Sequence, residues 1–131
     1  MTKFMLDTNT VSYMMRGVRS VVDNARRHKP SELCISAITL AELRYGAEKA
    51  GSERLHQLID TLLMDLRVES FGPDAAASYG RVAAALNRSG KQIGPLDTQI
   101  AAHALAIGAT IVTNNTKHFK AVPHLKITNW T

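Results

Sequence analysis

The chain has 131 residues, of which 45% are hydrophobic and 21% charged, and its formal net charge is +5. This length suits one domain with one core, and no run approaches the roughly 18 apolar residues of a membrane span. The N-terminus lacks the apolar stretch of a secretory signal, and a single cysteine, Cys34, excludes an internal disulfide. We therefore expect a cytoplasmic protein, whose basic charge favours a polyanionic partner.

Strands and helices are predicted to alternate along the chain. Short apolar runs predict strands at 3–6, 33–35, 68–71 and 110–113, with a short fifth at 125–128. Helical spacing of apolar residues predicts helices at 8–15, 18–28, 39–49, 55–66, 73–88 and 96–107, and polar residues 114–116 predict a loop. This alternation predicts an α/β fold in which helices cover both faces of a mostly parallel central sheet of four to five strands.

Three carboxylates fall where a predicted strand ends or a predicted helix begins. Asp7 follows the first strand, Glu42 lies early in the helix at 39–49, and Asp97 lies in the first turn after Pro95. In open parallel sheets the functional site lies outside the carboxyl ends of the strands. Carboxylates gathered there would form a hard-oxygen pocket for Mg²⁺ or Mn²⁺, ions that mostly handle phosphate. The pattern points to phosphodiester chemistry.

Each of these acids also has a structural explanation when it is taken alone. Asp7 can cap the helix that follows it, and Thr39-x-x-Glu42 matches a capping box. A negative charge such as Asp97 in a first helical turn stabilises an exposed helix by roughly 0.3–1 kcal/mol. All three, however, are flanked by apolar residues, and unpaired acids that approach one another there raise one another's pKa. A divalent cation would relieve that conflict.

Other chemistries lack the residues they require. The five histidines show no zinc-like spacing, His103 is expected to pack in its helix, and Cys34 is expected to be a buried strand residue. No GxGxxG, P-loop or GxSxG sequence occurs. A mechanism through an aspartyl phosphate commonly needs a second Asp two residues after the first, where this chain has Asn9.

Four segments, in this order, resemble those of PIN-domain ribonucleases and, more narrowly, of VapC toxins from bacterial type II toxin–antitoxin pairs. They are Phe4-Met-Leu-Asp7-Thr-Asn, Ile35-Ser-Ala-Ile-Thr-Leu-Ala-Glu42-Leu-Arg-Tyr-Gly, Gly94-Pro-Leu-Asp97-Thr-Gln-Ile-Ala and Ile111-Val-Thr-Asn-Asn-Thr-Lys-His-Phe119. The resemblance runs from end to end. It implies a single PIN domain over residues 1–131, folded as a three-layer α/β/α sandwich.

The resemblance also implies an Mg²⁺-dependent endoribonuclease, with Mn²⁺ as a second candidate ion. Asp7 and Asp97 match the principal metal ligands, and Glu42 matches a further ligand or a residue that orients the attacking water. We expect Thr113 and Asn115 to position the phosphate or a metal-bound water. Few aromatic side chains are available for stacking, which favours a structured RNA such as tRNA over a sequence read along a single strand.

At the fourth acidic position of the family, this chain has Asn115, with His118 where some toxins have Glu. This departure keeps a second hypothesis open, a non-catalytic domain that binds RNA or a partner. The resemblance further implies a VapB-type antitoxin as partner, contact with operator DNA only through that complex, and a toxin homodimer. The predicted helix at 55–66 is either a dimer contact or part of the core.

Overall fold

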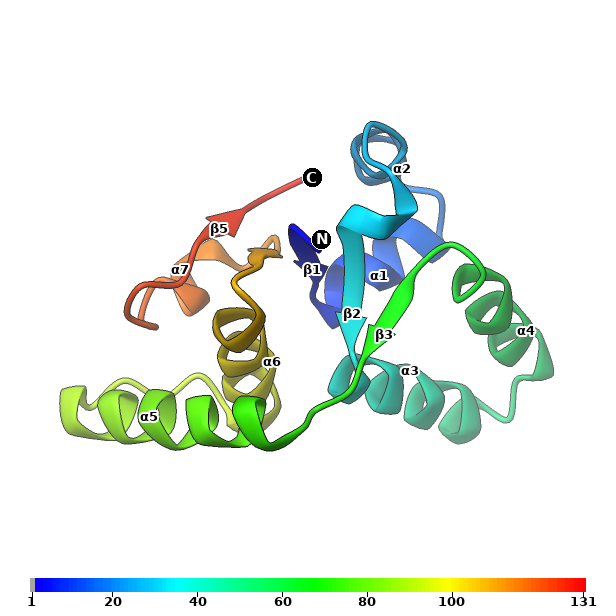
Figure 1. The fold of residues 1–131 in the computed structure, drawn as a ribbon. Coiled ribbons are helices and arrows are strands. Elements are labelled where there is room, and N and C mark those ends of the chain that lie inside the picture. The colour runs from blue at the N-terminus through cyan, green and yellow to red at the C-terminus, as the bar shows by residue number, and fades with distance from the viewer. Residues whose placement is uncertain (1) are drawn as a thin grey trace.

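The computed structural model describes residues 2–131 and contains short strands separated by helices (Figure 1). The strands are β1 (Phe4–Leu6), β2 (Leu33–Ser36), β3 (Arg67–Glu69), β4 (Thr110–Val112) and β5 (Ile127–Thr128). The helices are α1 (Thr8–Met15), α2 (Arg19–Arg26), α3 (Ala37–Ala50), α4 (Glu53–Leu62), α5 (Pro73–Ser89), α6 (Pro95–Ile107) and α7 (Thr116–Phe119), with a 3₁₀ turn η1 (Pro30–Glu32) before β2.

All pairings in the sheet are parallel, and the strand order is β3-β2-β1-β4-β5. The chain therefore builds outward from β1 in one direction through β2 and β3, and then returns to place β4 on the other side of β1. The order of the strands reverses between β1 and β4. In open α/β sheets this switch point opens a crevice at the carboxyl ends of the strands, where ligands bind.

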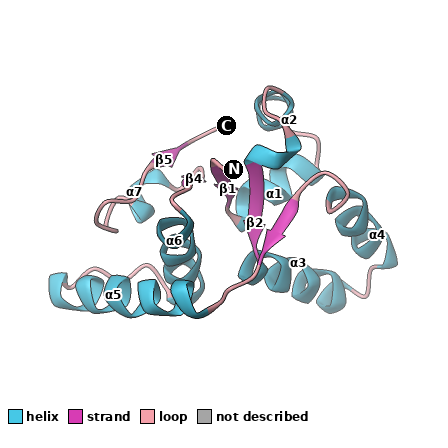
Figure 2. Cartoon of the chain, viewed as in Figure 1, coloured by secondary structure: helices cyan, strands magenta, loops and turns pink. Residues whose placement is uncertain are grey.

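Side chains alternate between the two faces of each buried strand, so each face has its own core. Met5, Cys34 and Ile111 pack with α5, α6 and α7, whereas Leu6, Ile35 and Val112 pack with α1–α4. Figure 2 shows the two helical layers on opposite sides of the strands. The period of two that separates the faces is a property of extended backbone. The predicted three-layer α/β/α fold with a parallel sheet is thus confirmed.

Two local features differ from the sequence prediction. The helix that carries Glu42 begins at Ala37, because Ser36 Oγ accepts the Ile38 N–H at 3.1 Å and ends β2 as an N-cap. Thr39 therefore lies inside α3 and does not form a capping box with Glu42. The polar loop predicted at 114–116 is present at residues 114 and 115, but Thr116 begins the short helix α7, which was not predicted and is anchored by the buried ring of Phe119.

The remaining boundaries differ by a few residues. The amphipathic segment predicted at 55–66 is helical only to Leu62, although Leu63 and Leu66 still pack against the α1–α4 core. Ile59 is buried and Leu55 and Leu62 are half-buried, so most of this apolar face belongs to the core, and its use as a dimer contact stays a prediction. Within residues 2–131, no helix is long and apolar enough to cross a membrane.

Candidate functional site

Asp7 lies where β1 ends and α1 begins, at the switch point of the sheet. Its N–H donates to Val112 O of β4 at 3.0 Å, which ties it to the neighbouring strand. Its carboxylate is 4% exposed, and Oδ1 accepts the Thr10 N–H at 2.8 Å, so Asp7 is the N-cap of α1 as its structural reading predicted. The cap occupies only Oδ1, which leaves Oδ2 for a ligand.

Glu42 lies in the second turn of α3, and its side chain approaches the start of α1 next to Asp7. Its Oε1 accepts a hydrogen bond from the hydroxyl of Thr8, the residue after Asp7, at 2.7 Å. Partial burial raises the pKa of Glu42, and the negative charges of Asp97 and Asp7 raise it further, whereas the Thr8 hydrogen bond acts in the opposite direction. Thr8 was not predicted as the partner of Glu42, because the two residues are far apart in the sequence.

Asp97 approaches from the second half of the chain, in the first turn of α6. Burial raises the pKa of its carboxyl, His118 opposes that shift, and the charge of Asp7 adds to it. The Nε2 atom of His118 lies 3.1 Å from Asp97 Oδ2 and 2.6 Å from Ile93 O. His118 therefore links α7 to both Asp97 and the loop that leads into α6.

The three carboxylates thus interact electrostatically. Their polar contacts, however, are with other residues: Asp7 with Thr10, Glu42 with Thr8 and Asp97 with His118. Asp7 raises the pKa of both Glu42 and Asp97, which is the conflict that a bound cation relieves. Among the described residues, no group of three or more His, Cys, Asp or Glu side chains is already close enough to hold a metal ion. The donors are hard oxygens with mutual repulsion and so fit a divalent cation, but they do not form a closed cage.

Thr113 and Asn115, the other two predicted site residues, lie on the loop after β4. Thr113 is fully buried, and its Oγ1 accepts the Asn115 N–H at 3.0 Å. Asn115 is exposed at the start of α7. The Thr113 hydroxyl thus shapes the loop, and Asn115 is the member of the pair that a ligand reaches.

Two residues that the sequence assigned to packing are indeed buried. His103 is 1% exposed, its Nδ1 lies 2.8 Å from Ser36 Oγ, and burial lowers its pKa. Cys34 is buried in β2, where burial raises the pKa of its thiol to about 12. Cys34 therefore stays a protonated thiol at neutral pH, and His103 stays a neutral ring that solvent does not reach.

The partial burial of Glu42 and the repulsion from Asp97 and Asp7 predict that Glu42→Gln stabilises the metal-free protein. An acid whose pKa is raised by folding destabilises the fold above that pKa, and folding stability recovers as the pH falls through it. Gln keeps the oxygen that accepts from Thr8 but carries no charge. We expect a melting temperature higher by roughly a few degrees at pH 7.5, a gain that shrinks towards pH 4. Differential scanning calorimetry measures both effects.

The matched control is Glu53→Gln on the exposed first turn of α4, where the negative charge favours the helix dipole. This control should melt at the same temperature as the wild type or slightly lower. A melting temperature of Glu42→Gln below that of Glu53→Gln would contradict the electrostatic account of the site.

The comparisons with known proteins agree with this architecture. The PIN domain family matches residues 4–125. A curated relative from Salmonella typhimurium, named tRNA(fMet)-specific endonuclease VapC, is 38% identical over 131 residues and covers 99% of each chain. A second, named Ribonuclease VapC, from Haemophilus influenzae, is 39% identical over 131 residues, again with 99% of each chain covered.

Solved structures give the same result. The toxin chain of a DNA-bound VapBC complex from Salmonella typhimurium superimposes with a TM-score of 0.95 at 38% identity, and the match covers 100% of both chains. Four segments in the expected order, an all-parallel sheet with acids at its switch point, and relatives that align from end to end all lead to one assignment. The chain belongs to the PIN domain family and, within it, to the VapC group.

Proposed function

We propose that this chain is the toxin of a type II toxin–antitoxin pair and a metal-dependent endoribonuclease that hydrolyses phosphodiester bonds in structured RNA. The observation that carries the proposal is the electrostatic coupling of Asp7, Glu42 and Asp97 at the switch point. Burial and the neighbouring negative charges raise the pKa of Glu42 and Asp97. Charged groups held in this way cost stability, and such costs are typical of functional sites.

In this proposal Asp7 and Asp97 are the principal ligands of Mg²⁺, for which Mn²⁺ can substitute. When bound, such an ion lowers the pKa of a coordinated water and neutralises charge on the phosphate. Glu42 serves as a further ligand or orients the attacking water, and the Thr8 hydroxyl holds its Oε1 in place. His118 fixes Asp97 Oδ2 from the α7 side.

Thr113 and Asn115 complete the proposed site. The buried Thr113 hydroxyl fixes the loop after β4, and the exposed amide of Asn115 faces the incoming phosphate or its water. An amide contributes no negative charge, so the protein supplies one anionic ligand fewer than it would with an acid at position 115. One protein-held cation suits this set better than two.

We assign tRNA as the RNA class. A relative that matches end to end bears the name of a tRNA(fMet)-specific endonuclease. This chain has three Tyr, three Phe and one Trp, which leaves few platforms for stacked single-stranded bases and favours recognition through backbone shape and charge. We further propose that residues 1–131 act in the cytoplasm as one PIN domain and as a homodimer.

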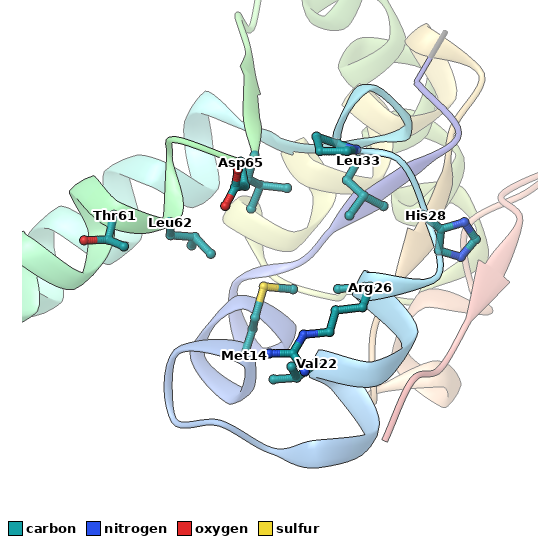
Figure 3. Close-up of a pocket in the computed structure, with 11 residues that line it drawn as sticks. Met14, Val22, Arg26, His28, Leu33, Thr61, Leu62 and Asp65 are labelled. Carbon is teal, nitrogen blue, oxygen red and sulfur yellow. The ribbon is translucent and has the colours of Figure 1, made fainter.

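The partner in this proposal is a VapB-type antitoxin, through which the complex contacts operator DNA. The structural relative from Salmonella typhimurium is a VapBC complex bound to DNA. A pocket of about 370 Å³ between α1, α2 and α4 has a mostly apolar lining, with Arg26 and Asp65 among its polar members (Figure 3). It includes Leu33 at the start of β2, opposite the edge that carries the acids, and offers an antitoxin segment an apolar surface.

One observation favours a second candidate, a non-catalytic domain that binds RNA or a partner. Within residues 2–131 the acids form no ready-made three-ligand cage, and positions 115 and 118 carry no acid. Incubation of the purified protein with total cellular RNA, with and without Mg²⁺, separates the two candidates. We expect new 5′ ends at one or a few discrete sites, only with Mg²⁺, and RNA binding without new ends would support the second candidate.

A further inference from the structure

The first helix carries a cluster of side chains outside the acid set. The guanidinium carbon of Arg16 lies over the Tyr13 ring, 5.0 Å from its centre, in a cation–π contact. The hydroxyl of Tyr13 accepts a hydrogen bond from Asn114 Nδ2 at 2.9 Å. Tyr13 belongs to the helix after β1 and Asn114 to the loop after β4, so their hydrogen bond spans the switch point next to Asp7 and Thr113.

The charge of Arg16 is uncompensated. Among residues 2–131 it makes no ion pair, although ion pairs hold several other cations, including Arg19, Arg44 and Arg67. Helix α1 contains no acidic residue, and Arg16 is exposed at its end. A planar, exposed guanidinium without a partner, held over a ring, is suited to a phosphate group.

Arg16 also lines a groove of about 400 Å³ between α1 and α4. One wall carries Asn9, Ser12 and Arg16, which share a face of α1 at helical spacing, and Met15, Leu55 and Leu58 supply apolar surface. The groove begins at Asn9, next to Thr8, whose hydroxyl holds Glu42. The Asn9 end of the groove is therefore the end nearer in the chain to the acid set, although none of the three acids lines the groove.

We propose that this α1–α4 groove binds an RNA nucleotide that adjoins the cleaved phosphodiester, an assignment that rests on the proposed function. Arg16 binds its phosphate, the apolar wall packs against its base or ribose, and Asn9 and Ser12 offer hydrogen bonds. The hydrogen bond between Tyr13 and Asn114 ties α1 to the loop after β4. Because Arg16 lies over the Tyr13 ring, this bond also restrains the position of Arg16. The positive charge of Arg16, unpaired among the described residues, and the position of Asn9 directly after Thr8 favour RNA as the occupant.

The test measures RNA binding without turnover. In an Asp7→Asn background, fluorescence anisotropy is recorded for labelled bulk tRNA and a labelled 12-nucleotide single strand at several salt concentrations. Arg16→Gln should weaken both complexes about five- to tenfold and reduce the salt slope by about one phosphate contact. Arg16→Lys should restore the slope but only part of the affinity, because an ammonium lacks the planar stack.

Arg27→Gln is the matched control, because Arg27 is exposed at the end of α2, before η1 and the start of β2, at the opposite edge of the sheet. Equal losses for Arg16→Gln and Arg27→Gln, or an unchanged salt slope, would overturn the proposal. So would an effect of Arg16→Gln on binding of an antitoxin peptide with no effect on RNA.

Failure of the groove and failure of the nuclease are distinguishable in one set of assays. If the wild-type protein cleaves RNA but Arg16→Gln does not weaken RNA binding, the groove proposal is refuted and the nuclease proposal stands. Arg16-dependent binding without any cleavage shows that the groove binds RNA but refutes the nuclease, and with it the place of the groove beside a cleaved phosphodiester.

Discussion

Asp7→Asn is expected to reduce Mg²⁺-dependent RNA cleavage by at least about 10²–10³-fold, which corresponds to several kcal/mol of lost transition-state stabilisation. Asp7 occupies the centre of the switch point, where its charge acts on both other acids. Substitution by Asn removes that charge and one anionic ligand. The measurement is the rate of appearance of the mapped 5′ ends under single-turnover conditions.

This substitution is informative because it should leave the fold intact. Asn caps helices about as well as Asp, so its Oδ1 can still accept the Thr10 N–H that Asp7 accepts at 2.8 Å. The thermal unfolding midpoint should stay close to that of the wild type. Undiminished cleavage by a folded Asp7→Asn protein would refute the assignment of Asp7 as a ligand.

Removal of divalent ions is the second change with a large expected effect. Chelation should abolish cleavage, and added Mg²⁺ or Mn²⁺ should restore it. Bound ion should also raise the unfolding temperature, because a ligand that binds only the native state stabilises it by RT ln(1 + [L]/Kd). Calorimetry with and without Mg²⁺ reports this effect without any reference to activity.

The stabilisation by Mg²⁺ should depend on pH with a definite sign. The pKa values of Glu42 and Asp97 are both raised, so a cation displaces more protons as the pH falls, and its affinity falls as well. The melting shift caused by Mg²⁺ should therefore be larger at pH 8 than at pH 5.5, and it should be much reduced in Asp7→Asn. A shift of equal size in wild type and variant would place the ion elsewhere.

The approximate positions of the strands were predictable from the sequence because the apolar runs of β1, β2 and β4 are mostly buried. The edge strands β3 and β5, in contrast, are shorter than predicted and only half-buried or exposed. Met5 and Leu6 point into opposite cores, as do Cys34 and Ile35. Because β1 ends at Leu6, Asp7 lies at the carboxyl edge of the parallel sheet, as predicted. The cap role of Asp7 was also predictable, since Asp before a helix has few other local uses.

The details that escaped prediction all depend on contacts between distant segments. Thr39 matched a capping box locally, but Ser36 is the real cap because β2 positions it and His103 of α6 contacts its hydroxyl. Helix α7 forms because Phe119 is buried in the α5–α7 core, a contact that the polar sequence around it does not reveal. His118 likewise meets Asp97 only after α6 and α7 have docked.

The reversal of strand order at β1 has a consequence for the timing of synthesis. Strand β4 pairs with β1 across more than a hundred intervening residues, with Met5 opposite Ile111, and such distant contacts form late in folding. A chain still emerging from the ribosome holds Asp7 and Glu42 well before Asp97 is made. The site of the proposed nuclease would then be completed only near the end of translation.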